Sequence, residues 1–144
     1  MYATYSDLQD RLKSFFDQLY ADADAEGGVN LEDAAADLEA AQSEVDGAAG
    51  VRYTVPVEAT ASLPLLKNWT LTIAEELAWR RDAKGKSPEN VKDRVKEVRR
   101  QLERLAEGKV KLQGAGENTT TGAGSSVIVS AATPVFTREK MSGF

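Results

Sequence analysis

Carboxylates are the side chains in this sequence whose types and spacing could support catalysis or bind a metal ion. Glu75 and Glu76 are adjacent, and Asp22, Asp24 and Glu26 lie within one short segment. Neighbouring residues on a helix point about 100° apart, so Glu75 and Glu76 do not easily share one site. The segment from Asp22 to Glu26 lacks the remaining ligands and the spacing of a calcium-binding loop. We therefore interpret these carboxylates as solvated surface charges.

The residue types that are missing exclude the common catalytic machinery. The 144 residues include no Cys and no His. A thiolate nucleophile, a Ser-His-Asp triad and a Cys or His zinc site are therefore excluded. The glycines at 114 and 116 are followed by neither the Lys-Ser/Thr pair nor the helix of a phosphate-binding loop. We expect no enzyme activity, no cofactor and no metal; an enzyme that uses a carboxylate is the alternative.

Basic residues gather between Arg80 and Arg104, where ten Lys or Arg residues accompany five acidic ones. One interpretation is a nucleic-acid-binding helical module that uses this basic face. The other is a face that forms salt bridges with another subunit. The acidic residues are interspersed with the basic ones, and the segment carries no recognition-helix motif and no interleaved aromatic platform. These features favour the salt-bridging face.

The net charge of −5 is unevenly distributed along the chain. Residues 1–50 carry a net charge of −10, residues 51–108 carry +3 and residues 109–144 carry +2. Such polarity can hold two helices together, orient a subunit in an assembly or present one sign of charge to a polyanion. Solvated helix faces without any partner are the simpler alternative.

Hydrophobic periodicity predicts four helices, and these helices carry most of the charged residues. The first begins with Thr4 or Ser6 as N-cap and runs to about Tyr20. The second opens at Asn30, and the third begins near Ser62 with Pro64 in its first turn. The fourth begins with Ser87 as N-cap and Pro88 at its first position, ends at Gly108, and has the clearest apolar stripe: Val91, Val95, Val98, Leu102 and Leu105.

The aromatic bulk of the third helix predicts that it is the central one, with a stripe of Leu65, Leu66, Trp69, Ile73 and Leu77 and with Trp79 as a further candidate. The second helix presents an alanine-rich face that lets a neighbour approach closely: Leu31, Ala34, Ala35, Leu38, Ala41, Val45 and Ala48. The predicted fold class is mainly α, a four-helix bundle-like domain with an extended C-terminal tail that can contribute short β-strands.

Two regions follow from this pattern: a helical domain over residues 1–108 and a tail over residues 109–144. Residues Lys109 to Leu112 alternate as a short strand would, residues 114–126 have a linker composition, and residues 127–144 form a docking segment. The docking segment regains residues that need a surface to cover: Val127, Ile128, Val129, Phe136, Arg138 and Phe144. They could add a strand or an aromatic anchor to another chain, or fold back on their own bundle.

Nothing in the sequence predicts insertion into a membrane. No run of 18 uncharged apolar residues is present, and the first residues lack the basic start and apolar block of a signal peptide. The absence of Cys fits a reducing cytoplasm. We expect a chain of intracellular origin.

Several motifs, taken in order, resemble the Mu-type head-to-tail adaptor (head–tail connector) proteins of tailed bacteriophages. The opening Met-Tyr-Ala-Thr-Tyr is followed by an acidic, Ala-rich helix that closes in Glu-Val-Asp-Gly at 44–47. Then come Arg-Tyr-Thr-Val-Pro at 52–56, Leu-Pro-Leu-Leu at 63–66 and Leu-Ala-Trp-Arg-Arg at 77–81. Gly-Lys-Val-Lys-Leu at 108–112 precedes an ending with Val-Phe-Thr-Arg at 135–138 and Ser-Gly-Phe at 142–144. The similarity covers nearly the whole chain, and the loop from Asp22 to Asn30 departs from it by being more acidic.

The resemblance implies a structural virion protein, made in the host cytoplasm and located at the neck of the phage. It would form a homo-oligomeric ring of about twelve copies that joins the portal to a stopper or tail completion protein, and DNA would pass through the ring without specific binding. A ring needs two different complementary faces on each subunit. We expect these faces to be charged, with Asp33, Asp37 and Glu44 on one side and Lys92, Lys96, Arg99 and Arg100 on the other.

Overall fold

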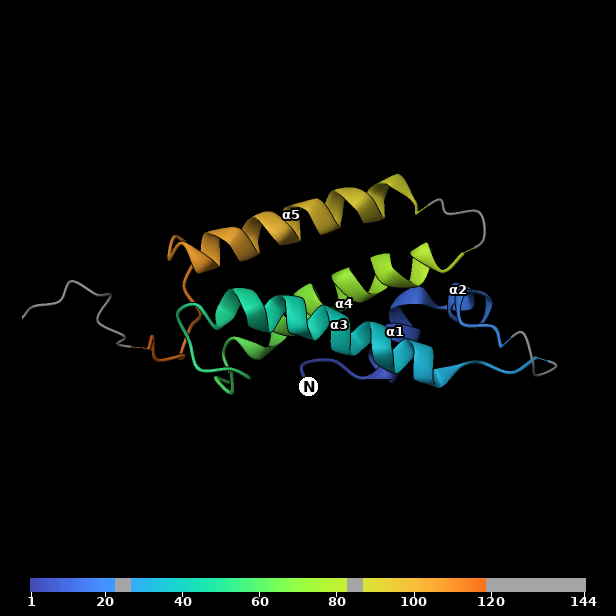
Figure 1. The fold of residues 1–144 in the computed structure, drawn as a ribbon, viewed down its shortest axis with the longest axis horizontal. Helices are drawn as coiled ribbons and strands as arrows, with labels where there is room; N and C mark the ends of the chain where they lie inside the picture. The colour runs from blue at the N-terminus through green and yellow to red at the C-terminus, as the bar shows by residue number, and fades with distance from the viewer. Residues whose placement is uncertain (23–26, 83–86, 119–144) are drawn as a thin grey trace, which may run out of the picture.

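The computed structural model describes residues 1–22, 27–82 and 87–118, and this part of the chain contains five helices. They are α1 (Tyr5–Leu12), α2 (Ser14–Leu19), α3 (Leu31–Ala49), α4 (Leu63–Arg80) and α5 (Glu89–Ala106). The three long helices lie along the long axis of the molecule, each antiparallel to the next, while α2 lies at one end (Figure 1). The prediction of a mainly helical, bundle-like fold is confirmed.

Helix α4 is the centre of the bundle, as its aromatic bulk predicted. It packs against α1, α3 and α5, and every residue from Thr70 to Glu76 is buried. Because α4 is surrounded by other helices, its polar side chains need hydrogen-bond or ion-pair partners, and its apolar side chains need apolar neighbours. One residue of the predicted stripe is misplaced: Leu65 is 39% exposed, in the first turn of the helix.

Helix α5 has the apolar stripe that its sequence predicted. Val91, Val95, Val98, Leu102 and Leu105 are all buried. The helix begins one residue later than predicted, because Pro88 has an extended ψ of 143° and is itself the N-cap in place of Ser87. It ends before Gly108, whose φ of 77° lies in the left-handed region that favours glycine.

The first predicted helix is interrupted, so the prediction of one helix to Tyr20 was wrong. Thr4 and Asp7 form a capping box at the start of α1, and the chain then turns sharply at Lys13, which has φ 52° and ψ −124°. The turn separates α1 from α2. After it, Phe16 and Tyr20 enter the core.

The buried face of α3 consists mostly of small residues. Asn30 caps the helix by accepting a hydrogen bond from the Asp33 N–H at 3.1 Å, as expected at that position. The buried residues are Ala34, Asp37, Leu38, Ala41, Val45 and Ala49. Leu31 and Ala35, which were expected on this face, are exposed. The alanines let α3 approach α4 closely, since little side-chain volume separates the two backbones.

Residues 109–118, expected to start the tail, lie against the helices. Leu112 is 4% exposed, and its N–H donates to the Tyr53 hydroxyl at 3.2 Å. The Ser62 hydroxyl donates a hydrogen bond to the Gln113 carbonyl at 2.7 Å. The Ser62 side chain therefore binds the segment after α5 and does not cap α4. The strand predicted at Lys109–Leu112 does not form; an isolated antiparallel bridge pairs Tyr53 with Glu117 instead.

Candidate interaction surfaces

Glu75 joins three helices from within α4. Its Oε2 accepts a hydrogen bond from Arg11 Nε of α1 at 3.0 Å, and its Oε1 accepts one from Arg94 Nη2 of α5 at 2.8 Å. Arg11 also donates to the side chains of Asn68 and Thr72, which fixes its position along α4. Glu75 is 6% exposed. The interpretation of this carboxylate as a solvated charge was therefore wrong.

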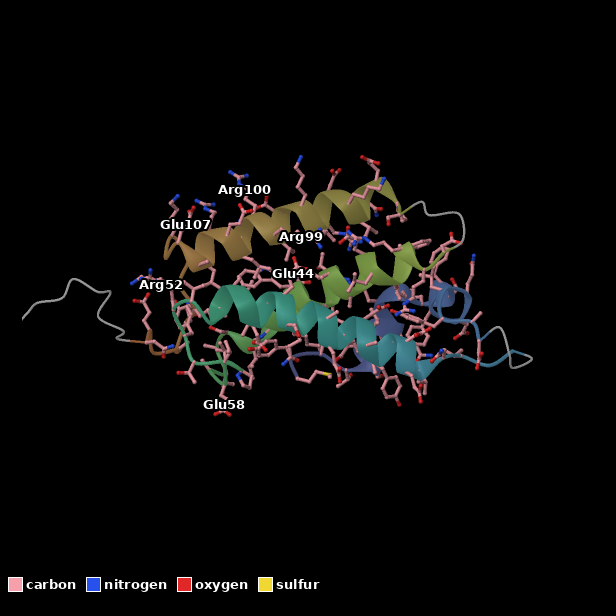
Figure 2. All side chains as sticks on the ribbon, viewed as in Figure 1. Glu44, Arg52, Glu58, Arg99, Arg100 and Glu107 are labelled. Carbon is pink, nitrogen blue, oxygen red and sulfur yellow. The ribbon has the colours of Figure 1, made fainter. Side chains whose placement is uncertain are left out.

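Glu76 is the second buried carboxylate of α4, 9% exposed, and it holds different arginines. Its Oε1 accepts from Arg80 Nη2 at 2.7 Å, and its Oε2 lies 3.0 Å from Arg99 Nη2. Arg99 also donates from Nε to Glu44 Oε1 of α3 at 2.7 Å, and the two side chains point toward each other between the helices (Figure 2). The Glu44 hydrogen bond raises the pKa of Arg99. The two adjacent glutamates share no site, as their helical spacing predicted.

A third charged cluster lies where α2, α3 and the end of α4 meet. Asp37 accepts a hydrogen bond from the Tyr20 hydroxyl at 2.8 Å and two from Arg81, at 2.8 and 2.9 Å. Arg81 also reaches Asp33 at 3.1 Å and lies over the Tyr20 ring. Burial and the Asp37 charge raise the pKa of Tyr20, and the Asp37 hydrogen bonds raise that of Arg81. This cluster ties the N-terminal third of the chain to α4.

Four of the seven residues expected on charged faces between subunits are thus paired within one subunit. Asp33 and Asp37 bind Arg81, and Glu44 binds Arg99. The exposed basic residues lie on the side of α5 that faces away from its apolar stripe. We call Lys92, Lys96, Arg100 and Arg104 the outer basic face. All four are exposed, and Arg100 points away from the bundle in Figure 2. A role of this face between subunits stays a prediction.

The nearest carboxylates to the outer basic face belong to α5 itself. Lys92 lies 3.8 Å from Glu89, and Arg100 lies 3.7 Å from Glu97. These pairs are long and solvent-exposed, so each contributes little to stability and leaves its basic partner available. Helical spacing places Arg100 opposite the apolar stripe of α5 and Arg99 at the edge of that stripe. Only the packing of α5 against α3 and α4 gives Arg99 its partners, Glu44 and Glu76.

The α3/α5 groove is an apolar hollow of about 370 Å³ that sequence reasoning missed. Gly47, Ala48, Val51, Leu102 and Ala106 form its apolar lining, and Glu44, Arg99 and Glu103 complete it. The signal in the sequence is the small size of Gly47 and Ala48 opposite Leu102. That signal becomes a groove only once the two helix ends lie side by side.

The predicted docking residues of the tail lie outside the described residues, so their role stays a prediction. They are Val127, Ile128, Val129, Phe136, Arg138 and Phe144. Within the described ranges, no three His, Cys, Asp or Glu side chains gather as metal ligands would. In the same ranges, no helix has the length and hydropathy needed to cross a membrane.

The described residues define the class of antiparallel helical bundles, in which buried carboxylates tie helices together. Residues 2–131 match the family described as Bacteriophage Mu, Gp36, and the chain belongs to that family. It is therefore a phage structural protein and a component of the virion, and the resemblance to a Mu-type phage protein is confirmed. No curated protein matches the chain.

Proposed function

We propose that this protein is a head-to-tail adaptor that forms a ring at the neck of the virion. The ring joins the portal to the tail or to a stopper protein and leaves a channel for DNA. Membership of the Mu Gp36 family and the ordered adaptor-like motifs support this assignment. The single structural observation that carries it is the outer basic face of α5, which faces away from the rest of its own subunit.

A closed ring is built from a heterologous contact, in which one surface of a subunit meets a different surface of the next. The outer basic face supplies one such surface. The opposing surface requires exposed acids, and the first three helices carry four of them: Asp10, Asp17, Glu32 and Glu39. These acids replace Asp33, Asp37 and Glu44 as the proposed partners of the neighbour, because the latter are neutralised within the subunit. Charge attraction of this kind fixes orientation more than affinity.

Charge reversal on the outer basic face tests the proposal in assembling phage. Arg100→Glu should leave the helical content of the purified chain unchanged, because the Arg100 side chain lies in solvent. Particles that carry it should accumulate as heads without tails. Lys13→Glu is the matched control, with the same change of charge on an exposed residue of the α1–α2 turn, and should join heads to tails normally. Normal joining with Arg100→Glu would contradict the role of this face.

Location is tested separately by a reconstruction of the neck of the particle, in which the subunit should lie between the portal and the tail. The alternative, a nucleic-acid-binding module that uses Arg80–Arg104, is tested by titrating the full chain with duplex DNA at low and moderate salt. The exposed acids Asp93, Glu97 and Glu103 on the same helix favour weak binding that does not saturate. Saturable binding that Arg100→Glu abolishes would support the alternative instead.

A further inference from the structure

The α3/α5 groove exposes apolar surface that a binding segment would cover. Val51, at its end, is 65% exposed, and a Cβ atom built on Gly47 meets nothing within 4 Å, so the groove is open along α3. The lining is mainly apolar, with charges confined to Glu44, Arg99 and Glu103. Glu44 and Arg99 are already paired with each other. An uncharged, β-branched segment is the chemistry that fits such a groove.

The chain itself leads to this groove. Asn118, the last described residue, donates its N–H to the Arg52 carbonyl at 2.6 Å, and Arg52 follows directly after Val51 of the groove. In Figure 1 the ends of α3 and α5 and the orange segment after α5 all lie at the same end of the molecule. Residues 119–144 therefore start at the rim of the groove.

We propose that the α3/α5 groove binds Val127, Ile128 and Val129 of the same subunit. Residues 119–126 contain only Thr, Gly, Ala and Ser, so Val127–Val129 is the first run of large apolar residues after the rim. Nine residues lead from Asn118 to Val127, and they can span roughly 30 Å. Closing so short a loop costs little entropy and keeps the segment at a high local concentration, which favours the same subunit over a second copy.

The dimensions of the groove and of the segment agree. Glu44 and Val51 lie at the two ends of the α3 side of the groove, and the helix from Glu44 to Ala49, followed by the turn to Val51, covers about 10 Å. Three extended residues also span about 10 Å. The segment would attach the base of the tail to its own bundle and leave residues 130–144, with Phe136, Arg138 and Phe144, to reach a partner. The inference concerns this chain alone and does not depend on the proposed adaptor function.

Disulfide trapping tests the contact, since the chain has no Cys of its own. The full chain with Ala48→Cys and Ile128→Cys should form an intramolecular disulfide under mild oxidation about ten-fold faster than the control pair Ala40→Cys and Ile128→Cys. Ala40 is exposed on α3 outside the groove. Equal rates for both pairs would overturn the proposal. Disulfide-linked dimers that increase with protein concentration would show that the occupant is a second copy, which also overturns it.

Hydrogen exchange on the full chain supplies a readout that needs no introduced Cys. The amides of residues 127–129 should exchange more slowly than those of residues 119–126, and Ile128→Asp should abolish that protection. Phe136→Asp, a matched substitution beyond the proposed contact, should leave it intact. Equally fast exchange across residues 119–129 in the unaltered chain would contradict the proposal.

Discussion

Two buried glutamates decide how the helices of this protein hold together at the level of single residues. Glu75 and Glu76 lie in the middle of the central helix, where an unpaired carboxylate would carry a large desolvation penalty. Each is instead bound by arginines from other turns or other helices. Arg11, Arg94 and Arg99 come from other helices and reach these carboxylates only in this arrangement, so their ion pairs help to fix which helix lies next to which.

Removing the charge of Glu75 should destabilise the fold. Glu75→Gln leaves Arg11 and Arg94 without their carboxylate partner, so we expect the free energy of unfolding to fall by about 2 kcal/mol, as measured by urea denaturation. Glu97→Gln is the control, because Glu97 is an exposed carboxylate of α5 whose ion pair is long. It should change stability by less than about 0.5 kcal/mol. Similar losses for the two variants would contradict a structural role for Glu75.

The carboxylate of Asp7 should make stability depend on pH at the acidic end. A hydrogen bond from Lys67 at 2.6 Å, together with one from the Thr4 N–H, lowers the pKa of Asp7 to about 2. Because the pKa is lower in the folded than in the unfolded chain, this stabilisation is complete above about pH 4 and is lost as the pH falls toward 2.

Asp7→Asn tests this dependence. The variant should be less stable than the original chain at pH 7, and its urea midpoint should fall less between pH 4 and pH 2, so that the two midpoints converge in acid. Asp10→Asn, on the same helix and exposed, is the matched control and should follow the original chain. Parallel pH profiles for Asp7→Asn and the original chain would show that Asp7 carries no shifted pKa.

At the level of the helices, local signals set most helix starts and ends, and two tertiary contacts override them between α1 and α2. Thr4 and Asn30 cap the starts of α1 and α3, and Gly108 follows the end of α5, as their residue types predict. The apolar spacing from Leu8 to Leu19 is compatible with one continuous helix, yet the chain turns at Lys13. The turn lets Tyr20 reach Asp37 of α3 at 2.8 Å while Phe15 contacts Trp79 of α4. Contacts distant in sequence therefore determine the shape of this segment.

Lys13 should be the position where glycine stabilises the chain. Its φ of 52° with ψ of −124° is a conformation that side chains with a Cβ atom adopt at a cost. Lys13→Gly should raise the free energy of unfolding by about 1 kcal/mol, after allowance for the greater freedom of glycine in the unfolded chain. Lys13→Ala keeps the Cβ atom and should give no such gain. Thermal unfolding followed by circular dichroism measures both; equal effects of the two substitutions would argue against strain at this turn.

For the whole molecule, the important boundary is where the folded domain ends. The change of composition after Gly108 predicts that the folded domain ends at residue 108. In the structure, however, Leu112 contacts Tyr53, Gln113 contacts Ser62 and Asn118 contacts Arg52. Residues 109–118, the described part of the predicted tail, thus pack against the segment that joins α3 to α4. Asn118, the last described residue, binds Arg52 next to Val51 of the α3/α5 groove.

Truncation should separate these two boundaries. A chain of residues 1–118 keeps the buried Leu112, whereas a chain of residues 1–108 loses it together with the hydrogen bonds of Tyr53 and Ser62. We expect the shorter chain to be less stable by about 3 kcal/mol, as judged by urea denaturation. Leu112→Ala in the full chain, with an expected cost of about 2 kcal/mol, is the control for the apolar part of that loss. Equal stability of the two truncated chains would place the boundary at 108.

The sequence by itself determined the features that depend on near neighbours along the chain. Helical periodicity identified the stripe of α5, aromatic bulk identified α4 as the central helix, and capping residues marked the starts of α1 and α3, because these signals lie within a few residues of one another. The ordered motifs also pointed to a Mu-type phage protein, and the family match confirms that.

Only the tertiary structure decided which charges are used inside the subunit and which remain outside. Helical spacing puts Arg99 nearer the apolar stripe of α5 than Arg100, but only the packed structure shows that Arg99 binds Glu44 and Glu76 while Arg100 points to solvent. Glu75 and Glu76 are charged residues of a type usually found at the surface, yet both are buried in the core. The physical reason is the same in each case: the partner of a buried charge lies on another helix, so its identity depends on how the helices pack.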